Sequence, residues 1–208
     1  MKIGVPREIK PQENRIGLTP ESVKSLVSNG HEVLIESNGG FEAGFDNDQY
    51  KSAGAKIVEN AADIFNDAEI IVKVKEPLSN EVKMIRENQI IYTYLHLAAA
   101  KELTEGLIKS KSICIAYETV TDENGRLPLL APMSAVAGRM SIQAGAHSLE
   151  KNQKGRGLLL GGAPGVTGGN VVILGGGVVG ENAAVIATGM QDLEAVDNIR
   201  GYGMMGGI

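Results

Sequence analysis

Apolar residues in the first 130 positions of the chain come in short runs, separated by stretches with helical spacing. Several runs are nearly continuous in apolar side chains, as expected of strands that are covered on both faces. The runs are KIGV, HEVLIE, AKIVE, EIIVKV, QIIYTYL and SICIAYE. Strands that alternate with helices in this way predict a parallel sheet with helices on both faces.

The intervening helical stretches have recognisable ends. Thr19 precedes Pro20, and the stretch closes at Gly30, which gives an N-cap, a proline at the first helical position and a glycine after the last turn. Asp46 and Gly54 have the same roles in DNDQYKSAG. Two more helices are predicted in SNEVKMIREN and AAKELTEGLIKS.

The pattern changes near Pro132. One long helical stretch, MSAVAGRMSIQAGAHSLEKNQ, precedes a glycine-rich loop and the apolar run NVVILG, which we predict to be a strand. We expect an α/β protein with two domains. Residues 1–130 would form a parallel sheet of flavodoxin-like type, and residues 131–208 a connector helix followed by an incomplete second α/β unit of Rossmann type.

Composition narrows the class of protein. The 208 residues carry a formal net charge of −5 with the basic residues scattered, so neither a nucleic acid nor a membrane is an expected partner. No apolar run approaches a membrane span, and Met1 leads directly into a strand-like segment, so we expect a cytoplasmic protein. The single cysteine, Cys114, excludes an internal disulfide and is expected to be a small buried residue.

Four polar residues follow predicted strands, where open parallel sheets bind their ligands: Arg15, Lys75, His96 and Glu118. Each also has a purely structural explanation. Arg15 would be a solvated loop charge, Lys75 a surface residue, Glu118 a salt-bridge or helix-dipole partner, and His96 a hydrogen-bonded core histidine. Their convergence on one edge of the sheet favours a binding site.

The first three residue types form a coherent chemical set. A planar arginine binds a carboxylate through two hydrogen bonds, a lysine holds or polarises a carbonyl oxygen, and a histidine exchanges protons near neutral pH. A small 2-oxo or 2-amino acid fits these three groups. The three histidines of the chain have no metal-ligand spacing, so no metal is expected.

The segment VVILGGGVVGENAA contains the pattern GxGxxG through Gly175, Gly177 and Gly180, between a predicted strand and a predicted helix. In a dinucleotide site these glycines provide the tight turn, the approach to the pyrophosphate and the close packing of helix on strand. The alternative is a glycine-rich turn of any α/β unit. An acidic residue is expected about 20 positions further on to bind the ribose. Asp197 lies near this offset, although LEAVD is a poor strand.

Seven segments together resemble NAD-dependent alanine dehydrogenase from Met1 to about Met190. They are MKIGVPREIKPQENRIGLTPESV, VKVKEP, YLHLAA, AYETV, LPLLAPMSAVAGR, GGAPGV and VVILGGGVVGENAA. The NAD-binding subunit of proton-pumping transhydrogenase has a similar layout, but YLHLAA and APMSAVAGR resemble alanine dehydrogenase more.

The resemblance implies reversible oxidative deamination of L-alanine to pyruvate and ammonia, with hydride passing to NAD. His96 would be the proton donor or acceptor. The substrate-binding positions would be Arg15, Lys75 and Met133, with Glu118 supporting them. The cofactor-binding positions would be Ser134, Gly175, Gly177, Val178, Val179, Gly180 and Asp197.

The residues after Met190 do not resemble the family's continuation, and the family's chains are nearly twice as long. A second catalytic group, an aspartate in the missing part, therefore has no counterpart, and we expect impaired activity and NAD binding that is weak or lost. Apolar surfaces left uncovered would favour a homo-oligomer. The alternative to an enzyme is a non-catalytic module, derived from alanine dehydrogenase, that binds pyruvate or oligomerises.

Overall fold

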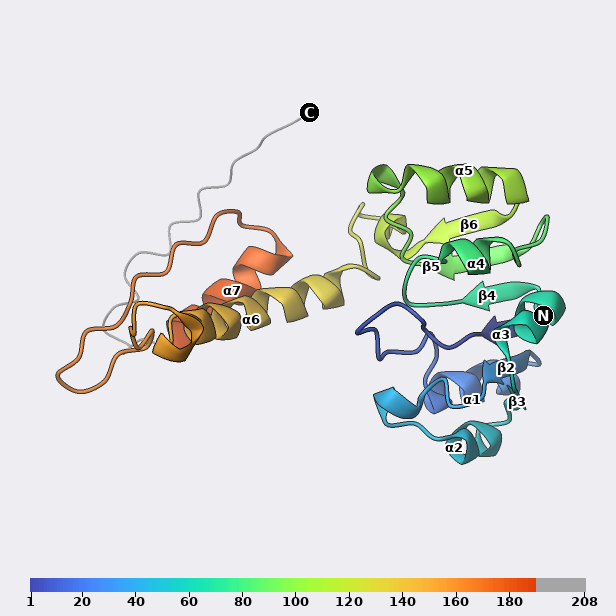
Figure 1. The fold of residues 1–208 in the computed structure, drawn as a ribbon, viewed down its shortest axis with the longest axis horizontal. Helices are drawn as coiled ribbons and strands as arrows, with labels where there is room; N and C mark the ends of the chain where they lie inside the picture. Colours follow the sequence, from blue (N-terminus) through green and yellow to red (C-terminus); the bar gives the residue numbers. More distant parts are fainter. Residues whose placement is uncertain (190–208) are drawn as a thin grey trace. The chain divides into compact units, whose positions relative to one another are not determined.

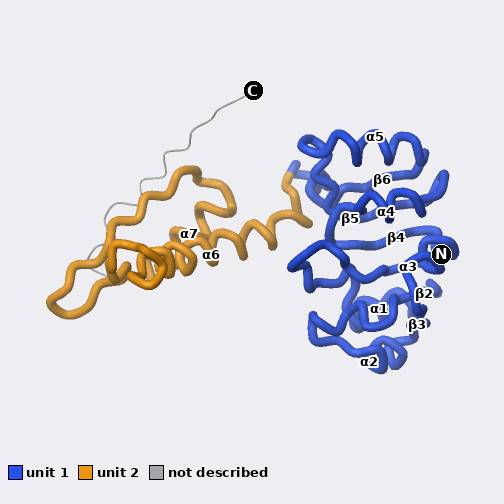
Figure 2. Tube along the Cα trace, viewed as in Figure 1, with its two compact units in different colours: residues 1–125 blue, residues 126–208 orange. Residues whose placement is uncertain are grey.

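The computed structural model describes residues 1–189, so Asp197 lies outside the described part of the chain. Contacts along the chain divide it into two compact units, Met1–Gly125 and Arg126–Ile208, which are coloured separately in Figure 2. The second unit is described as far as Gly189.

Six parallel strands form the sheet of the first unit, in the order β3-β2-β1-β4-β5-β6 (Figure 1). The strands are β1 (Lys2–Val5), β2 (Glu32–Glu36), β3 (Lys56–Val58), β4 (Ile70–Val72), β5 (Ile90–Thr93) and β6 (Ile113–Ala116). Each lies inside one of the six predicted runs, and the predicted parallel α/β sheet is confirmed. The strand order is the one typical of dinucleotide-binding sheets, in place of the 2-1-3-4-5 order of flavodoxin-like sheets.

Helices cover both faces of this sheet. They are α1 (Pro20–Ser28), α2 (Asn47–Ser52), α3 (Ala61–Asp67), α4 (Ser79–Val82) and α5 (Lys101–Ser110). One core contains Val23 of α1 and Tyr50 of α2, packed against β1 and β2. The other contains Phe65 of α3 and Leu107 of α5, packed against β4 and β5. Burial on both faces explains why the strands read as continuous apolar runs.

The predicted ends of α1 and α2 are confirmed, whereas the helix predicted in SNEVKMIREN ends at Val82 and the long helix ends at Ser148. The Thr19 hydroxyl accepts the N–H of Ser22 at 3.3 Å, and Asp46 forms a capping box with Gln49. The helix α3 was missed by the sequence pattern, although Asn60 caps it by accepting the N–H of Asp63 at 3.0 Å. An Asn cap followed by only seven helical residues, about two turns, is too weak a periodic signal to identify a helix.

Gly4 shows how tightly the first unit is packed. A Cβ atom at this position would lie 2.5 Å from Cγ2 of Ile64 and 2.7 Å from Cβ of Ala68, both in or next to α3. The absence of a side chain in β1 therefore lets α3 approach the centre of the sheet.

In the described part of the second unit, the helices α6 (Ala131–Ser148) and α7 (Val178–Gly189) pack against each other. Ile142, Ala183 and Ala187 form its buried core. The predicted strand NVVILG is wrong, because residues 170–175 have no strand conformation and the Leu174 side chain is 94% exposed. A strand requires a hydrogen-bonded neighbour, and the described residues of this unit contain no second strand to pair with it.

Candidate functional site

The site of interest lies at the point where the strand order reverses, between β1 and β4. Arg15 follows β1, and Lys75 follows the neighbouring strand β4. His96 and Glu118 follow β5 and β6, the next two strands of the sheet. Because all six strands are parallel, these four residues share the carboxyl edge of the sheet, where open α/β sheets bind ligands.

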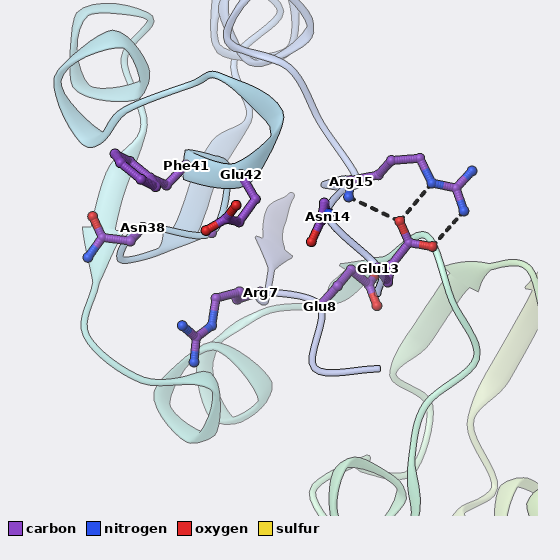
Figure 3. A pocket seen from close by; sticks show the side chains of 9 residues that line it. Arg7, Glu8, Glu13, Asn14, Arg15, Asn38, Phe41 and Glu42 are labelled. Carbon is purple, nitrogen blue, oxygen red and sulfur yellow. Dashed lines mark hydrogen bonds and ion pairs between the residues drawn. The ribbon is translucent and has the colours of Figure 1, made fainter. Parts of the chain in front are cut away.

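Arg15 is held in a two-point ion pair with Glu13. Its Nε lies 2.7 Å from Oε1 of Glu13 and its Nη2 lies 2.6 Å from Oε2. The pair lines a cavity of about 520 Å³, with Asn38 and Phe41 at the other side (Figure 3). The hydrogen bond from Arg15 holds the pKa of Glu13 below its usual value, against the effect of burial.

Lys75 is positioned through its backbone. Its carbonyl accepts the hydroxyl of Thr93 at 3.0 Å, and its N–H donates to Oε1 of Glu8 at 3.3 Å. The same Glu8 oxygen accepts the N–H of Val74 at 2.6 Å. Since Glu8 follows β1 and Lys75 follows β4, one carboxylate joins the loop that carries Arg15 to the loop that carries Lys75.

A buried ion cluster anchors Glu8. Lys73 Nζ lies 3.1 Å from Glu8 and 2.8 Å from Glu81, and all three side chains are at most 2% exposed. The other oxygen of Glu81 accepts the N–H of Leu78 at 2.8 Å. Buried charges are tolerated when paired and hydrogen-bonded in this way, so the cluster fixes both loops of the site.

His96 has a left-handed backbone conformation, with φ of 51°, and its side chain is 56% exposed. The carboxylate of Glu118 accepts the backbone N–H of His96 at 2.7 Å and that of Leu95 at 3.0 Å. The Tyr94 ring stacks at 6.2 Å on the imidazole. The exposed ring excludes the alternative of a core histidine and turns His96 towards solvent.

The pKa of Glu118 reflects this role. Burial raises the pKa of the carboxyl, but the backbone N–H groups, first that of His96, outweigh burial and hold the pKa below its usual value. Glu118 is therefore an ionised hydrogen-bond acceptor that supports the His96 backbone.

Several residues of this edge were missed by sequence reasoning: Glu8, Glu13, Lys73, Glu76 and Glu81. Lys73 had the clearest available signal, because a charged residue inside the apolar run EIIVKVK indicates a buried ion pair. The glutamates flank the predicted residues in sequence, but their orientation depends on tertiary contacts.

The glycine motif lies in the second unit, across the loop before α7 and the first turn of that helix. Gly175 has φ of 104°, and a Cβ at Gly180 would lie 1.9 Å from the carbonyl oxygen of Gly175, so neither position accommodates a side chain. A Cβ at Gly177 would meet nothing within 4 Å, which leaves room for a ligand to approach. The turn and the helix N-terminus fit the pyrophosphate of a dinucleotide.

A cavity of about 730 Å³ adjoins this turn. It is lined in part by Ser134, Gly175, Gly177, Val178, Val179 and Gly180. Met133 lies one residue before Ser134 in α6 and is 38% exposed. In residues 1–189, no group of three or more potential ligands could hold a metal, and no helix is long and apolar enough to cross a membrane.

These features define a doubly wound α/β protein with a charged site at the strand-order reversal and a dinucleotide-type turn. Residues 4–137 match the family described as alanine dehydrogenase/PNT, N-terminal domain, and residues 141–199 match the corresponding C-terminal domain. The chain therefore belongs to the alanine dehydrogenase/PNT family.

Similar proteins of known name agree with this assignment. Over 190 residues the chain is 54% identical to an alanine dehydrogenase from Halomonas elongata and 53% identical to one from Methanococcus maripaludis, covering 91% of this chain and 51% of each relative. A solved L-alanine dehydrogenase matches with a TM-score of 0.86 and 56% identity over 91% of this chain and 52% of that one. A transhydrogenase from Sinorhizobium meliloti, at 21% identity and a TM-score of 0.77, shares the fold. The chain thus spans about half the length of the curated relatives that it matches.

Proposed function

We propose that this chain carries the substrate site of an NAD-dependent alanine dehydrogenase, which converts L-alanine to pyruvate and ammonia reversibly. The observation that carries the proposal is the gathering of Arg15, Lys75 and His96 at the carboxyl ends of three adjacent strands. The names of the relatives support the reaction. We assign residues 1–130 as the substrate domain and residues 131–208 as the connector helix with part of the cofactor domain.

Each residue has a role that follows from its chemistry. Arg15 binds the substrate carboxylate, and Lys75 holds the neighbouring carbonyl or amino group. His96 exchanges a proton with the substrate, since its ring is exposed at this edge. Glu118 supports the His96 backbone, and Met133 is assigned to substrate binding from the resemblance to alanine dehydrogenase.

The cofactor role is assigned to the turn before α7. When NAD is bound, it would accept the hydride from the substrate. The backbone from Gly175 to Gly180 would hold its pyrophosphate, with Val178 and Val179 in the first turn of the helix, and Ser134 would lie on the nicotinamide side. Asp197 would bind the ribose. We expect NAD to bind weakly or not at all to this chain, because the described part of the unit contains no paired strand.

The alternative is a pyruvate-binding or oligomerising module without catalysis. It is favoured by the large apolar side chains that remain exposed in the second unit, including Met140 at 58%, Val172 at 81% and Val185 at 56%. Ile113 and Ile115 of β6 are also exposed. Apolar surfaces of this kind favour association, so we propose a homo-oligomer. We propose a cytoplasmic location, in keeping with the single free thiol of Cys114.

Turnover tests the enzyme proposal. The purified chain is mixed with NADH, pyruvate and ammonium, and NADH oxidation is followed by absorbance. Because NAD binding is expected to be weak, the enzyme proposal expects slow oxidation at high NADH concentration, and His96→Ala should abolish it. The matched control is His147→Ala, which removes another exposed histidine, on α6, and leaves the rate unchanged.

The outcome also separates the two candidates. Pyruvate binding without any NADH oxidation supports the module. Absence of both pyruvate binding and turnover rejects the enzyme and the pyruvate-binding module, and leaves the oligomerising module. Size-exclusion chromatography with light scattering tests the homo-oligomer, and a clean monomer would contradict it.

A further inference from the structure

Glu76 lies directly after Lys75 and has no role so far. Its Oε1 accepts a hydrogen bond from Lys10. Its Oε2 lies 3.6 Å from Nδ1 of His96. Among the described residues 1–189, this Oε2 is the only buried side-chain oxygen or nitrogen without a hydrogen-bond partner.

A buried carboxylate oxygen without a partner is unfavourable unless another state of the protein satisfies it. The imidazole Nδ1 of His96 lies beside this oxygen. A separation of 3.6 Å is slightly longer than a hydrogen bond, and catalytic hydrogen bonds commonly tighten when the substrate binds.

We infer that Glu76 is a positioning residue for His96: its carboxylate accepts a hydrogen bond from Nδ1–H and leaves Nε2 to exchange a proton with the substrate. The inference rests on the proposed function for the role of His96. The hydrogen bond at one imidazole nitrogen decides which nitrogen carries the proton in the neutral ring. Proton transfer then has a defined path. Nε2 takes the proton, the imidazolium is stabilised by the Glu76 carboxylate, and the proton leaves from Nε2 while Nδ1–H stays in place.

Other groups near the ring do not fill this role. The carboxylate of Glu118 already accepts the backbone N–H groups of Leu95 and His96. Tyr94 presents its ring face to the imidazole.

Two further features suit Glu76 to the role of hydrogen-bond acceptor for His96 Nδ1–H. Burial opposes ionisation of Glu76, but the hydrogen bond and positive charge of Lys10 help to hold its pKa below the usual value, so it is a charged acceptor. Lys10 also fixes the carboxylate orientation by binding the opposite oxygen.

The experiment reads the tautomer of His96 directly. The full chain is labelled with ¹⁵N-histidine, and long-range ¹H–¹⁵N spectra are recorded without substrate at a pH where histidine rings are neutral. The His96 signals are identified among those of the three histidines by their absence from the spectrum of a His96→Asn variant. We expect His96 to be mainly the Nδ1–H tautomer in the unmodified chain.

Glu76→Gln gives the contrasting case. Lys10 needs an oxygen acceptor, so it holds the amide oxygen and turns the amide NH₂ towards Nδ1. A donor facing Nδ1 requires the Nε2–H tautomer, so we expect the major tautomer of His96 to switch. Glu32→Gln is the matched control, because Glu32 also pairs with a lysine but at the start of β2, and it should leave the His96 spectrum unchanged.

A second variant covers the case in which Glu76→Gln fails to fold. Lys10→Met keeps the carboxylate and should retain the Nδ1–H tautomer. A mainly Nε2–H ring in the unmodified chain, or an Nδ1–H ring that persists in Glu76→Gln, would overturn the inference. Because no substrate is present, the result is independent of pyruvate binding and turnover, so failure of the proposed function would be recognised separately.

Discussion

The carboxylate of Glu118 and the backbone of His96 are joined across two strand ends: Oε1 of Glu118 accepts the His96 N–H at 2.7 Å. This hydrogen bond holds His96 in a left-handed conformation that residues other than glycine seldom adopt. The orientation of the imidazole therefore depends on Glu118, although Glu118 need not touch the substrate.

Replacing Glu118 should weaken this support. Glu118→Gln removes the charge that strengthens the hydrogen bonds to Leu95 and His96, and we expect the free energy of unfolding to fall by about 1.5 kcal/mol. Glu123→Gln, which changes an exposed carboxylate, is the control and should have no measurable effect. Urea unfolding of the three proteins measures the difference, and equal stabilities would contradict the role given to Glu118.

The same substitution changes the acid sensitivity. The folded-state pKa of Glu118 lies below its usual value of 4.5, so its contribution to stability is present above that pH and is lost as pH falls through the folded-state pKa. The stability difference between the unmodified chain and Glu118→Gln should therefore shrink below pH 4.5. A difference that stays constant across this range would show that the charge is not responsible.

Glu13 is expected to oppose substrate binding. Its carboxylate occupies two nitrogens of Arg15 and places a negative charge beside the position proposed for an anionic substrate. Glu13→Gln should therefore tighten pyruvate binding about fivefold, which corresponds to ~1 kcal/mol. Glu42→Gln alters another carboxylate of the same cavity and should have a smaller effect. Weaker binding in Glu13→Gln would mean that Glu13 organises Arg15 for the substrate.

The buried cluster around Lys73 should be the most sensitive part of the site. Lys73→Met leaves Glu8 and Glu81 buried without their partner, so we expect a loss of about 3–5 kcal/mol in unfolding free energy. Lys56→Met breaks an exposed pair with Glu32 and should have no measurable effect on stability, because solvent screens such a pair.

A triple variant separates charge from packing in this cluster. Adding Glu8→Gln and Glu81→Gln to Lys73→Met removes the unpaired charges, and much of the lost stability should return. If the triple variant is no more stable than Lys73→Met, the loss comes from packing.

The burial of Tyr50 should make the stability of the protein fall at alkaline pH. Burial raises the pKa of Tyr50 from 10.0 to about 12, and its hydroxyl donates to the carbonyl of Leu18 at 2.8 Å. The folded state therefore retains this proton more strongly, and the contribution to stability is present below pH 10 and is lost as pH rises towards 12. Tyr50→Phe should lose about 1 kcal/mol at neutral pH but show a shallower decline above pH 10. Parallel declines would contradict the assignment.

Much of the first unit could be predicted because its strands are buried on both faces and so leave continuous apolar runs. The same pattern gave a wrong strand prediction at NVVILG, because an apolar run forms a strand only where a neighbouring strand supplies hydrogen bonds. Strand ends also located Arg15, Lys75, His96 and Glu118 on one edge of the sheet.

The partners of these residues could not be predicted in the same way. Glu13 and Glu76 lie in loops, where the direction of a side chain is decided by contacts that are distant in sequence. The pairing of Glu76 with Lys10 spans 66 positions, and that of Glu8 with Lys73 spans 65.

Pyruvate binding tests the central claim most directly. Isothermal titration calorimetry of the purified chain should detect a single pyruvate site, and Arg15→Met should weaken it by about tenfold or more because two charge-assisted hydrogen bonds are lost. Arg156→Met, which removes an exposed arginine of the second unit, should leave the affinity unchanged. Absence of pyruvate binding, or equal affinity in Arg15→Met and the unmodified chain, would contradict the proposed site.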